Sequence, residues 1–207
     1  MILDTYHLVF QDEFDTAETL STVWRTQYAF GAEGDLVART LPANGELQIY
    51  VDPQYAGTGD TALGLNPFRV EDGILTITAN PTPPAYRDDL WDYPYTSGLI
   101  TTERSFSQRY GYFEMRADLP EGAGLWPAFW LLPSDGKPIA ELDVMERIYD
   151  GPDAIHTTVH SGATGTREVH TARTDIEDLS EGFHTFAVLW NETTISWIVD
   201  GIEIFRA

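Results

Sequence analysis

The chain has 207 residues, of which 43% are hydrophobic, enough for one sizeable core and a single domain. Its formal net charge is −21, with only 12 lysines and arginines, so neither nucleic acid nor an anionic membrane surface is an expected partner. The absence of cysteine excludes a disulfide scaffold, and no apolar run has the length of a transmembrane helix.

Short segments of alternating or β-branched residues predict strands along most of the chain. Asp15 and Glu18 have the spacing of a capping box and predict a short helix over residues 16–22. Asp72-Gly73 and Asp200-Gly201 each stand between alternating segments and predict hairpins. The strands expected besides those two hairpins cover residues 8–15, 44–51, 98–106, 110–119, 139–148, 155–160, 184–190 and 194–199. Many short strands separated by turn residues imply an all-β sandwich.

Two longer segments predict loops. Residues 162–181 are polar, and residues 80–95 contain four prolines together with Tyr86, Trp91, Tyr93 and Tyr95. Loops on a rigid scaffold often carry binding residues. The aromatic loop is therefore either a wall of a binding cleft or a segment held in place by aromatic packing alone.

The strand over residues 139–148 carries three carboxylates, Glu141, Asp143 and Glu146. Glu141 and Asp143 share a face because side chains alternate along a strand, whereas Glu146 has the opposite parity. A β-bulge near Val144–Met145 would return Glu146 to the same face. Glycoside hydrolysis uses two such carboxyl groups, and a third would raise the pKa of a neighbour or share its proton. The alternative is a solvated edge strand that merely carries charges.

Trp126 and Trp130 have the same parity just before this strand, so both rings can lie on one face. Flat indole rings are platforms for sugar rings, and the alternative is a pair of core tryptophans. Their position next to three acids favours sugar binding. His156 and His160 share a face of a later strand, but they lie roughly 13 Å apart and are not expected to share a metal.

The segments WPAFWLLP and ELDVME resemble glycoside hydrolase family 16, whose signature is Glu-x-Asp-x-x-Glu with the extra residue of its laminarinase-like members. Further segments resemble the family in its order: FQDEFD, NGELQIY, YTSGLITTERSF, YGYFEMRADLPEGAGLWPAFW, IHTTVHSG and FHTFAVLWNETTISWIVDGIEIFR. The segment over residues 52–79 most resembles bacterial glycanases that cut exopolysaccharides such as succinoglycan. The resemblance implies a β-jelly roll of two curved antiparallel sheets with a substrate cleft on the concave one.

The resemblance also implies catalytic roles for four residues. Glu141 would be the nucleophile, Asp143 would hold and tune it, and His160 would support the site. Glu146 would be the acid/base, which requires a raised pKa that we expect from the neighbouring acids.

The same resemblance implies substrate-binding roles. Trp126 and Trp130 would bind glycosyl rings, and Asn44 and Glu46 would lie near the donor subsites. The activity implied is that of a retaining endo-β-glycanase acting on β-1,3- or mixed β-1,3/1,4-glucans. The alternatives are a depolymerase of a bacterial exopolysaccharide, a transglycosylase and a non-catalytic carbohydrate-binding jelly roll.

No cofactor is required by this chemistry, although the family resemblance implies a structural calcium ion bound by Glu13 and the backbone of Gly45. Family members continue through further strands, one of which supplies an Asp to that calcium, so residues 1–207 are expected to form a single domain that lacks C-terminal strands. We expect a secreted monomer, unless association supplies the missing strands. The N-terminal residues do not have the pattern of a signal peptide.

Overall fold

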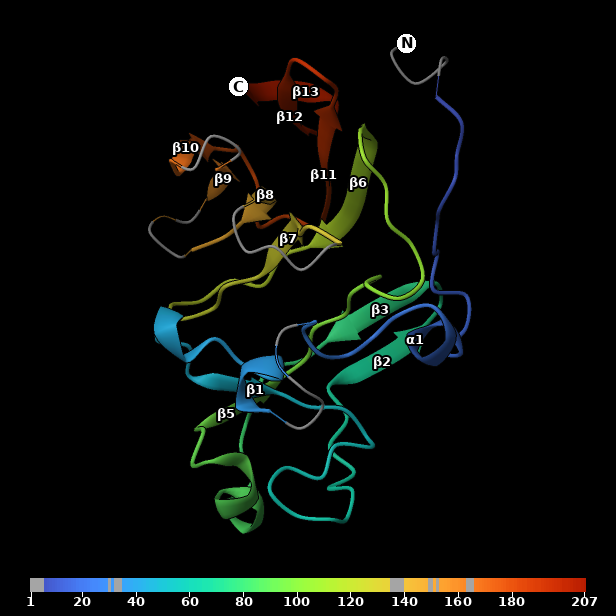
Figure 1. Ribbon diagram of the computed structural model, residues 1–207, viewed down its shortest axis with the longest axis vertical. Helices are drawn as coiled ribbons and strands as arrows, with labels where there is room; N and C mark the ends of the chain where they lie inside the picture. Colours follow the sequence, from blue (N-terminus) through green and yellow to red (C-terminus); the bar gives the residue numbers. More distant parts are fainter. Residues whose placement is uncertain are drawn as a thin grey trace. The chain divides into compact units, whose positions relative to one another are not determined.

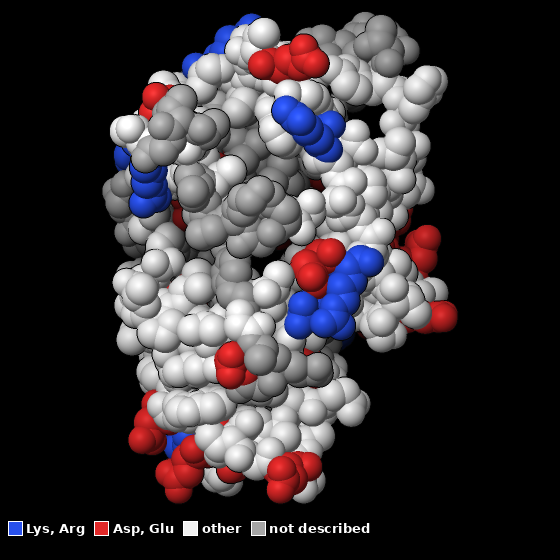
Figure 2. Space-filling model, viewed as in Figure 1, with Lys and Arg blue, Asp and Glu red and all other residues white. Residues whose placement is uncertain are grey.

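The structure is a computed structural model that describes residues 6–29, 31, 35–134, 140–148, 151, 153–162 and 166–207. The chain divides into two compact units, one formed by residues 8–107 and the other by residues 108–207 with residues 1–7. Carboxylates lie at several separate places on the face drawn in Figure 2. No helix in the described part of the chain is long and apolar enough to cross a membrane.

The unit that contains residues 108–207 is a sandwich of two four-stranded antiparallel sheets (Figure 1). One sheet has the order β10-β9-β8-β7 and the other the order β13-β12-β11-β6. The strands are β6 (Gly111–Asp118), β7 (Ala128–Leu131), β8 (Glu141–Glu146), β9 (Ala154–Ser161), β10 (Glu168–Asp175), β11 (Phe183–Trp190), β12 (Ile195–Val199) and β13 (Ile202–Arg206).

The core of this sandwich is formed by inward side chains from both sheets. Met145 and Ile155 of one sheet cluster with Phe186 and Val199 of the other, and all four are at most 5% exposed. The fully buried Trp197 donates its indole N–H to the carbonyl oxygen of Asp143 at 2.8 Å, which joins the sheets at the middle of β8. The strand that carries the acids is therefore fixed from its inner side.

The unit formed by residues 8–107 has shorter elements. Its strands form a sheet of order β1-β5-β4 and a separate β2–β3 hairpin. A small core contains Ile49, Val51, Tyr55 and Leu90. The elements are α1 (Thr19–Thr22), η2 (Leu36–Ala38), η3 (Pro42–Asn44), β1 (Gln48–Tyr50), β2 (Phe68–Glu71), β3 (Ile74–Ile77), β4 (Asn80–Pro81), η4 (Pro84–Tyr86), η5 (Asp88–Leu90) and β5 (Tyr95–Ser97).

The prediction of an all-β sandwich is confirmed, and so are both hairpins. Asp72 and Gly73 have φ values of 52° and 73°, and Asp200 and Gly201 have values of 48° and 78°. Two successive positive φ values form the tight turn whose twist matches that of the flanking strands. Local turn chemistry was therefore sufficient to locate them.

Several predicted elements are wrong. Residues 8–14 form no strand, and Phe10 instead stacks on Phe106 with ring centroids 4.7 Å apart. Residues 98–106 form only an isolated bridge between Thr101 and Arg25. The supposed loop over residues 162–181 contains β10. The helix predicted over residues 16–22 is observed as Thr19–Thr22, so Glu18 rather than Asp15 stands at its N-cap, and Glu18 makes no side-chain capping bond.

Two predicted strands are shorter in the structure than expected. The strand over residues 44–51 is reduced to Gln48–Tyr50, because residues 42–44 form η3. The strand over residues 139–148 is observed as Glu141–Glu146. Ile139 lies outside the described residues.

Candidate active site

A β-bulge in β8 brings its three acids to one face, as predicted. On one side, Asp143 pairs with Thr158 and Glu146 pairs with His156, so three steps along β8 match two along β9. On the other side, Phe129 pairs with Met145 and Trp130 with Asp143, so two steps match one. The extra residue lies at Val144–Met145, where both side chains are buried. Glu146 therefore shares the face of Glu141 and Asp143.

The neighbouring strands supply the rest of this face. Residues directly opposite each other in a sheet project to the same side. Trp130 of β7 lies opposite Asp143, and His160 and His156 of β9 lie opposite Glu141 and Glu146. The sheet thus combines carboxylates, imidazoles and an indole on one surface.

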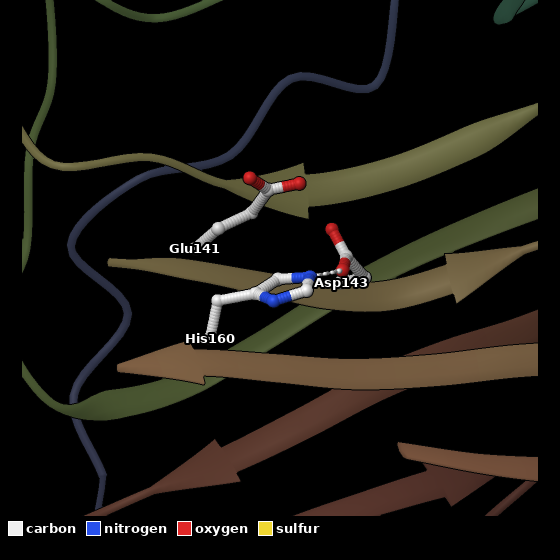
Figure 3. A group of neighbouring side chains, drawn as sticks. All are labelled: Glu141, Asp143 and His160. Atoms are coloured by element: carbon white, nitrogen blue, oxygen red, sulfur yellow. Dashed lines mark ion pairs between the residues drawn. The ribbon is translucent and has the colours of Figure 1, made fainter. Parts of the chain in front are cut away.

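Glu141, Asp143 and His160 form a tight group (Figure 3). Each offers a ligand atom, and these atoms lie within 4.8 Å of one another. His160 Nε2 lies 3.6 Å from Asp143 Oδ2, which is longer than a hydrogen bond and marks the two as neighbours. Arg167 donates to His160 Nδ1 at 2.9 Å. Because a guanidinium only donates, this bond assigns the proton of the neutral imidazole to Nε2, the atom facing Asp143.

The pKa of the Asp143 carboxyl lies well above its ordinary value. Burial raises its pKa to about 8, together with the charges of Glu141 and Glu146 and a hydrogen bond to Glu141. Its side chain is 4% exposed. The raised pKa favours the protonated form of Asp143, and the hydrogen bond to Glu141 gives that proton a partner.

Glu146 is half-buried and bonded to Trp126. The indole Nε1 of Trp126 donates to Glu146 Oε1 at 2.9 Å. Burial raises the pKa of Glu146 and the charge of Glu141 adds to this, whereas the Trp126 bond and the charges of His156 and His160 lower it. The predicted rise in the pKa of Glu146 is confirmed, although burial contributes more to it than the neighbouring acids do.

The predicted binding residues fall into two groups. Trp126 is 46% exposed and lies beside Glu146, and Trp130 lies beside Asp143. Asn44 and Glu46 belong to the other unit, so their proximity to the acids stays a prediction. Glu46 Oε2 accepts the N–H of Leu41 at 2.9 Å and the hydroxyl of Thr40 at 3.2 Å.

The predicted calcium ligands, Glu13 and Gly45, lie in the unit formed by residues 8–107. Glu13 is exposed, and Gly45 adopts a left-handed φ of 70°. A carboxylate and a carbonyl fall short of the six to eight oxygens that calcium takes. Among the described residues, Glu141, Asp143 and His160 form the group of three or more acidic or histidine side chains that has the spacing of metal ligands. Glu13 is not part of this group. These two donors alone do not make a calcium site.

Sequence reasoning missed Arg167, which orients His160. It follows residues 163–165, which lie outside the described residues, and directly precedes β10 (Glu168–Asp175). No local pattern marks this position, because β10 is recognised only by its pairing with β9, and that pairing brings the residues next to β10 beside His160.

The sequence is similar to those of several bacterial glycanases. The chain is 45% identical over 201 residues to the endo-1,3-1,4-beta-glycanase ExsH of Rhizobium meliloti, an alignment that covers 96% of this chain and 42% of ExsH. It is 34% identical to a beta-glucanase of Rhodothermus marinus, with 97% of this chain and 65% of that protein covered. The chain thus spans less than half the length of ExsH.

Solved structures agree with the observed sandwich. The laminarinase catalytic domain of Thermotoga maritima superposes with a TM-score of 0.72 at 29% identity, covering 97% of this chain and 76% of that domain. SCLam, a non-specific endo-beta-1,3(4)-glucanase, gives a TM-score of 0.74 at 31% identity over 97% of this chain and 71% of its own. The model of glycosyl hydrolases family 16 matches residues 60–207, and the chain belongs to this family.

Proposed function

We propose that the protein is a retaining endo-β-glycanase that hydrolyses β-1,3- or mixed β-1,3/1,4-glucan by double displacement. The observation that carries this proposal is the bulge in β8, which gathers Glu141, Asp143 and Glu146 on one face. A surface with three adjacent carboxyl groups is costly for a module that only binds sugar. A hydrolase needs two of them to react and gains from a third that holds a proton.

In the first step, a Glu141 oxygen forms a bond to the anomeric carbon while the bond from that carbon to the leaving oxygen breaks. Glu146 gives its proton to the leaving oxygen. In the second step, Glu146 takes a proton from water, whose oxygen attacks the anomeric carbon and displaces Glu141. The raised pKa of Glu146 suits this exchange, because the group must begin protonated.

Asp143 and His160 would act on the nucleophile. The proton of Asp143 is shared with Glu141, so Asp143 holds the attacking carboxylate in place. As negative charge leaves Glu141 during attack, the shared proton can move toward Asp143 and keep the nucleophile free. His160, oriented by Arg167, places an N–H beside Asp143.

The substrate assignment rests on relatives. ExsH is named an endo-1,3-1,4-beta-glycanase, and SCLam an endo-beta-1,3(4)-glucanase. We propose the same linkage types here, with Trp126 and Trp130 as ring platforms. An exopolysaccharide is the second candidate substrate, favoured by the resemblance of residues 52–79 to bacterial glycanases that cut exopolysaccharides.

The test is release of reducing ends from laminarin, mixed-linkage glucan, agarose, carrageenan and succinoglycan. Proton NMR of the first products then gives their anomeric configuration. Cleavage of a β-glucan with β-anomeric first products and a rapid fall in viscosity is expected. No cleavage by folded protein, or α-anomeric first products, would contradict the proposal. Products longer than the substrate would identify transglycosylation.

We further propose that hydrolysis needs no cofactor, because carboxyl groups supply both the nucleophile and the proton. Activity should therefore survive dialysis against EDTA. A rise in melting temperature on adding calcium would reveal the structural ion that the family resemblance implies, since a ligand stabilises the state that binds it. We also propose that the protein is extracellular and monomeric, and sedimentation of the purified protein tests the monomeric state.

A further inference from the structure

The acid–histidine group on the face of β8 and β9 has the geometry of a metal site as well as that of a hydrolase. Glu141, Asp143 and His160 each offer one ligand atom, and these atoms lie within 4.8 Å of one another (Figure 3). His160 Nε2 and Asp143 Oδ2 are 3.6 Å apart. Two ligands of a tetrahedral zinc ion lie roughly 3.3 Å apart, since each is about 2.0–2.1 Å from the metal. One imidazole and two carboxylates are also the ligand types of three-ligand zinc sites.

A transition metal bound by this group would stop the proposed reaction. Zinc coordinated by Glu141 would engage the carboxylate oxygens that are needed to attack the anomeric carbon. The net charge of −21 attracts divalent cations and raises their concentration near the protein surface. A hydrolase that uses this group therefore gains from a feature that disfavours metal binding.

Arg167 approaches the group from the side of β10. It lies two residues before Val169, which pairs with His160 in the ladder between β9 and β10. Its Nη2 donates to His160 Nδ1 at 2.9 Å. A guanidinium has N–H donors and no acceptor, and it does not lose its proton in proteins. Nδ1 must therefore supply the lone pair of this hydrogen bond.

This hydrogen bond leaves the imidazole without a ligand atom for a metal. A neutral imidazole has one nitrogen with a lone pair and one with a hydrogen, so Nε2 presents a hydrogen toward Asp143. Zinc could bind Nε2 only if that proton moved to Nδ1, where two N–H donors would then face each other. Histidines that bind metals have the opposite arrangement, because their second N–H donates to a carboxylate, a carbonyl or water.

We propose that Arg167 keeps transition metals out of the catalytic group by holding the His160 proton on Nε2. Arg167 acts through His160 and is a positioning residue. The consequence for activity rests on the proposed function, whereas the position of the proton and the affinity for zinc can be measured on protein of any activity.

Three substitutions separate the hydrogen bond of Arg167 from its charge. Lysine keeps a charged donor, and methionine removes both donor and charge. Glutamine also removes the charge, but its amide oxygen can accept a hydrogen bond from Nδ1–H. Arg167 is exposed, so all three variants should fold.

Calorimetry with zinc chloride at a fixed pH compares the variants. The affinity should be lowest for the wild type and Arg167→Lys, higher for Arg167→Met and highest for Arg167→Gln. Arg167→Gln should bind zinc about tenfold to a hundredfold more tightly than the wild type, the range by which such partners change metal affinity. Equal affinities for the four proteins would overturn the proposal.

Two controls assign the effect to the His160 ring. Arg173→Met removes the same charge from β10, but Arg173 lies opposite His156 and is bonded to Asp175, so the zinc affinity should stay close to that of the wild type. In a His160→Ala background, Arg167→Gln should no longer raise the affinity. A rise that persists there, or an equal rise in Arg173→Met, would show a general effect of charge and overturn the proposal.

Nitrogen NMR of the histidine rings locates the proton directly. The chain has five histidines, and the His160 signals are assigned by their loss in His160→Ala. A ring nitrogen that carries hydrogen is well separated in chemical shift from one with a free lone pair. Hydrogen should be on Nε2 in the wild type and on Nδ1 in zinc-bound Arg167→Gln. Hydrogen on Nδ1 in the wild type would overturn the proposal.

Inhibition by zinc connects this property with activity. Zinc should inhibit hydrolysis by Arg167→Gln at about one tenth, or less, of the concentration that inhibits the wild type. Equal inhibition of the two active proteins would overturn the proposal. If neither protein cleaved any glycan, the proposed function would fail, while calorimetry and NMR would still decide the role of Arg167.

Discussion

The protonated carboxyl of Asp143 is buried against a neighbour that is proposed to react as an anion. Its folded pKa of about 8 lies above the ordinary value of 3.8. The native state therefore binds more protons than the unfolded state between these values. Stability from this group is fully present below the ordinary value and is lost as pH rises through the folded pKa.

Asp143→Asn tests this linkage. The amide keeps a hydrogen-bond donor but no longer titrates, so the free energy of unfolding should fall less between pH 5 and pH 8 than in the wild type. At pH 8 the melting temperature of the variant should be at least about 2 °C higher than that of the wild type. Urea unfolding at both pH values measures the difference. Glu46 and Glu146 also have raised pKa values, but they titrate in both proteins. Equal slopes for the two proteins would refute the assignment.

Glu146→Gln separates the proton donor from the nucleophile. Glutamine cannot protonate a leaving oxygen, so the rate on polymer should fall by about 10²–10⁴ and the alkaline decline of the pH profile should disappear. A dinitrophenyl glycoside leaves without a proton and should still give a burst. Glu141→Gln should give no burst on either substrate. If both variants behaved alike, the two roles would be wrong.

At the level of elements, Arg147 ties the end of β8 to the segment that follows β6. Its side chain is 1% exposed, and its Nη1 donates to the carbonyls of Leu119 and Pro120 at 3.3 Å each. Nη2 lies 3.8 Å from Glu121 Oε1. This segment leads to Trp126, the residue bonded to Glu146. Arg147, which directly follows the proposed acid Glu146, thus anchors the segment that leads to Trp126.

Arg147→Met should therefore destabilise the protein by about 2 kcal/mol or more, because buried carbonyls lose a charged donor. Methionine retains much of the apolar stem. Arg104→Met is the control, since Arg104 is 68% exposed and its loss should stay within about 0.5 kcal/mol. Urea unfolding of both variants compares them, and equal losses would contradict the anchoring role.

Elements were predictable where a local rule decides them. The hairpins at Asp72 and Asp200 follow from turn chemistry, and the bulge follows from the parity of three acids. β10 was missed because its residues are largely exposed, so no hydrophobic period marks it and only pairing with β9 makes it a strand. Residues 98–106 have strand-like composition, but Ser105 and Phe106 instead bond back to the carbonyl of Thr102.

The site was predictable to the same extent. Composition and spacing located the acids of β8, Trp130 of the neighbouring strand β7 and Trp126 just before that strand. The assignment of the His160 proton depends on Arg167, seven residues away, and the pKa of Asp143 depends on burial. Both require contacts between segments that no local pattern encodes.

For the whole molecule, the charge of −21 creates self-repulsion that added salt screens. Carboxylates lie at several separate places on the face in Figure 2. The melting temperature should rise when sodium chloride is raised from about 20 mM to about 0.5 M, where the screening length is far shorter. Calorimetry in both buffers measures it, and an unchanged or lower melting temperature would contradict this expectation.

The bulge in β8 also obeys an odd–even rule. Deleting Val144 alone would leave an ordinary strand whose glutamate, aspartate and glutamate alternate in step, so all three acids would stay on the working face at the loss of one buried side chain. Deleting Val144 and Met145 together would turn the last glutamate into the core and abolish activity. A spacing of two residues without a bulge and a spacing of three residues with one therefore place the aspartate and the last glutamate on the same face. The face on which that glutamate lies matters for activity, whereas the number of residues between the two acids can differ by one.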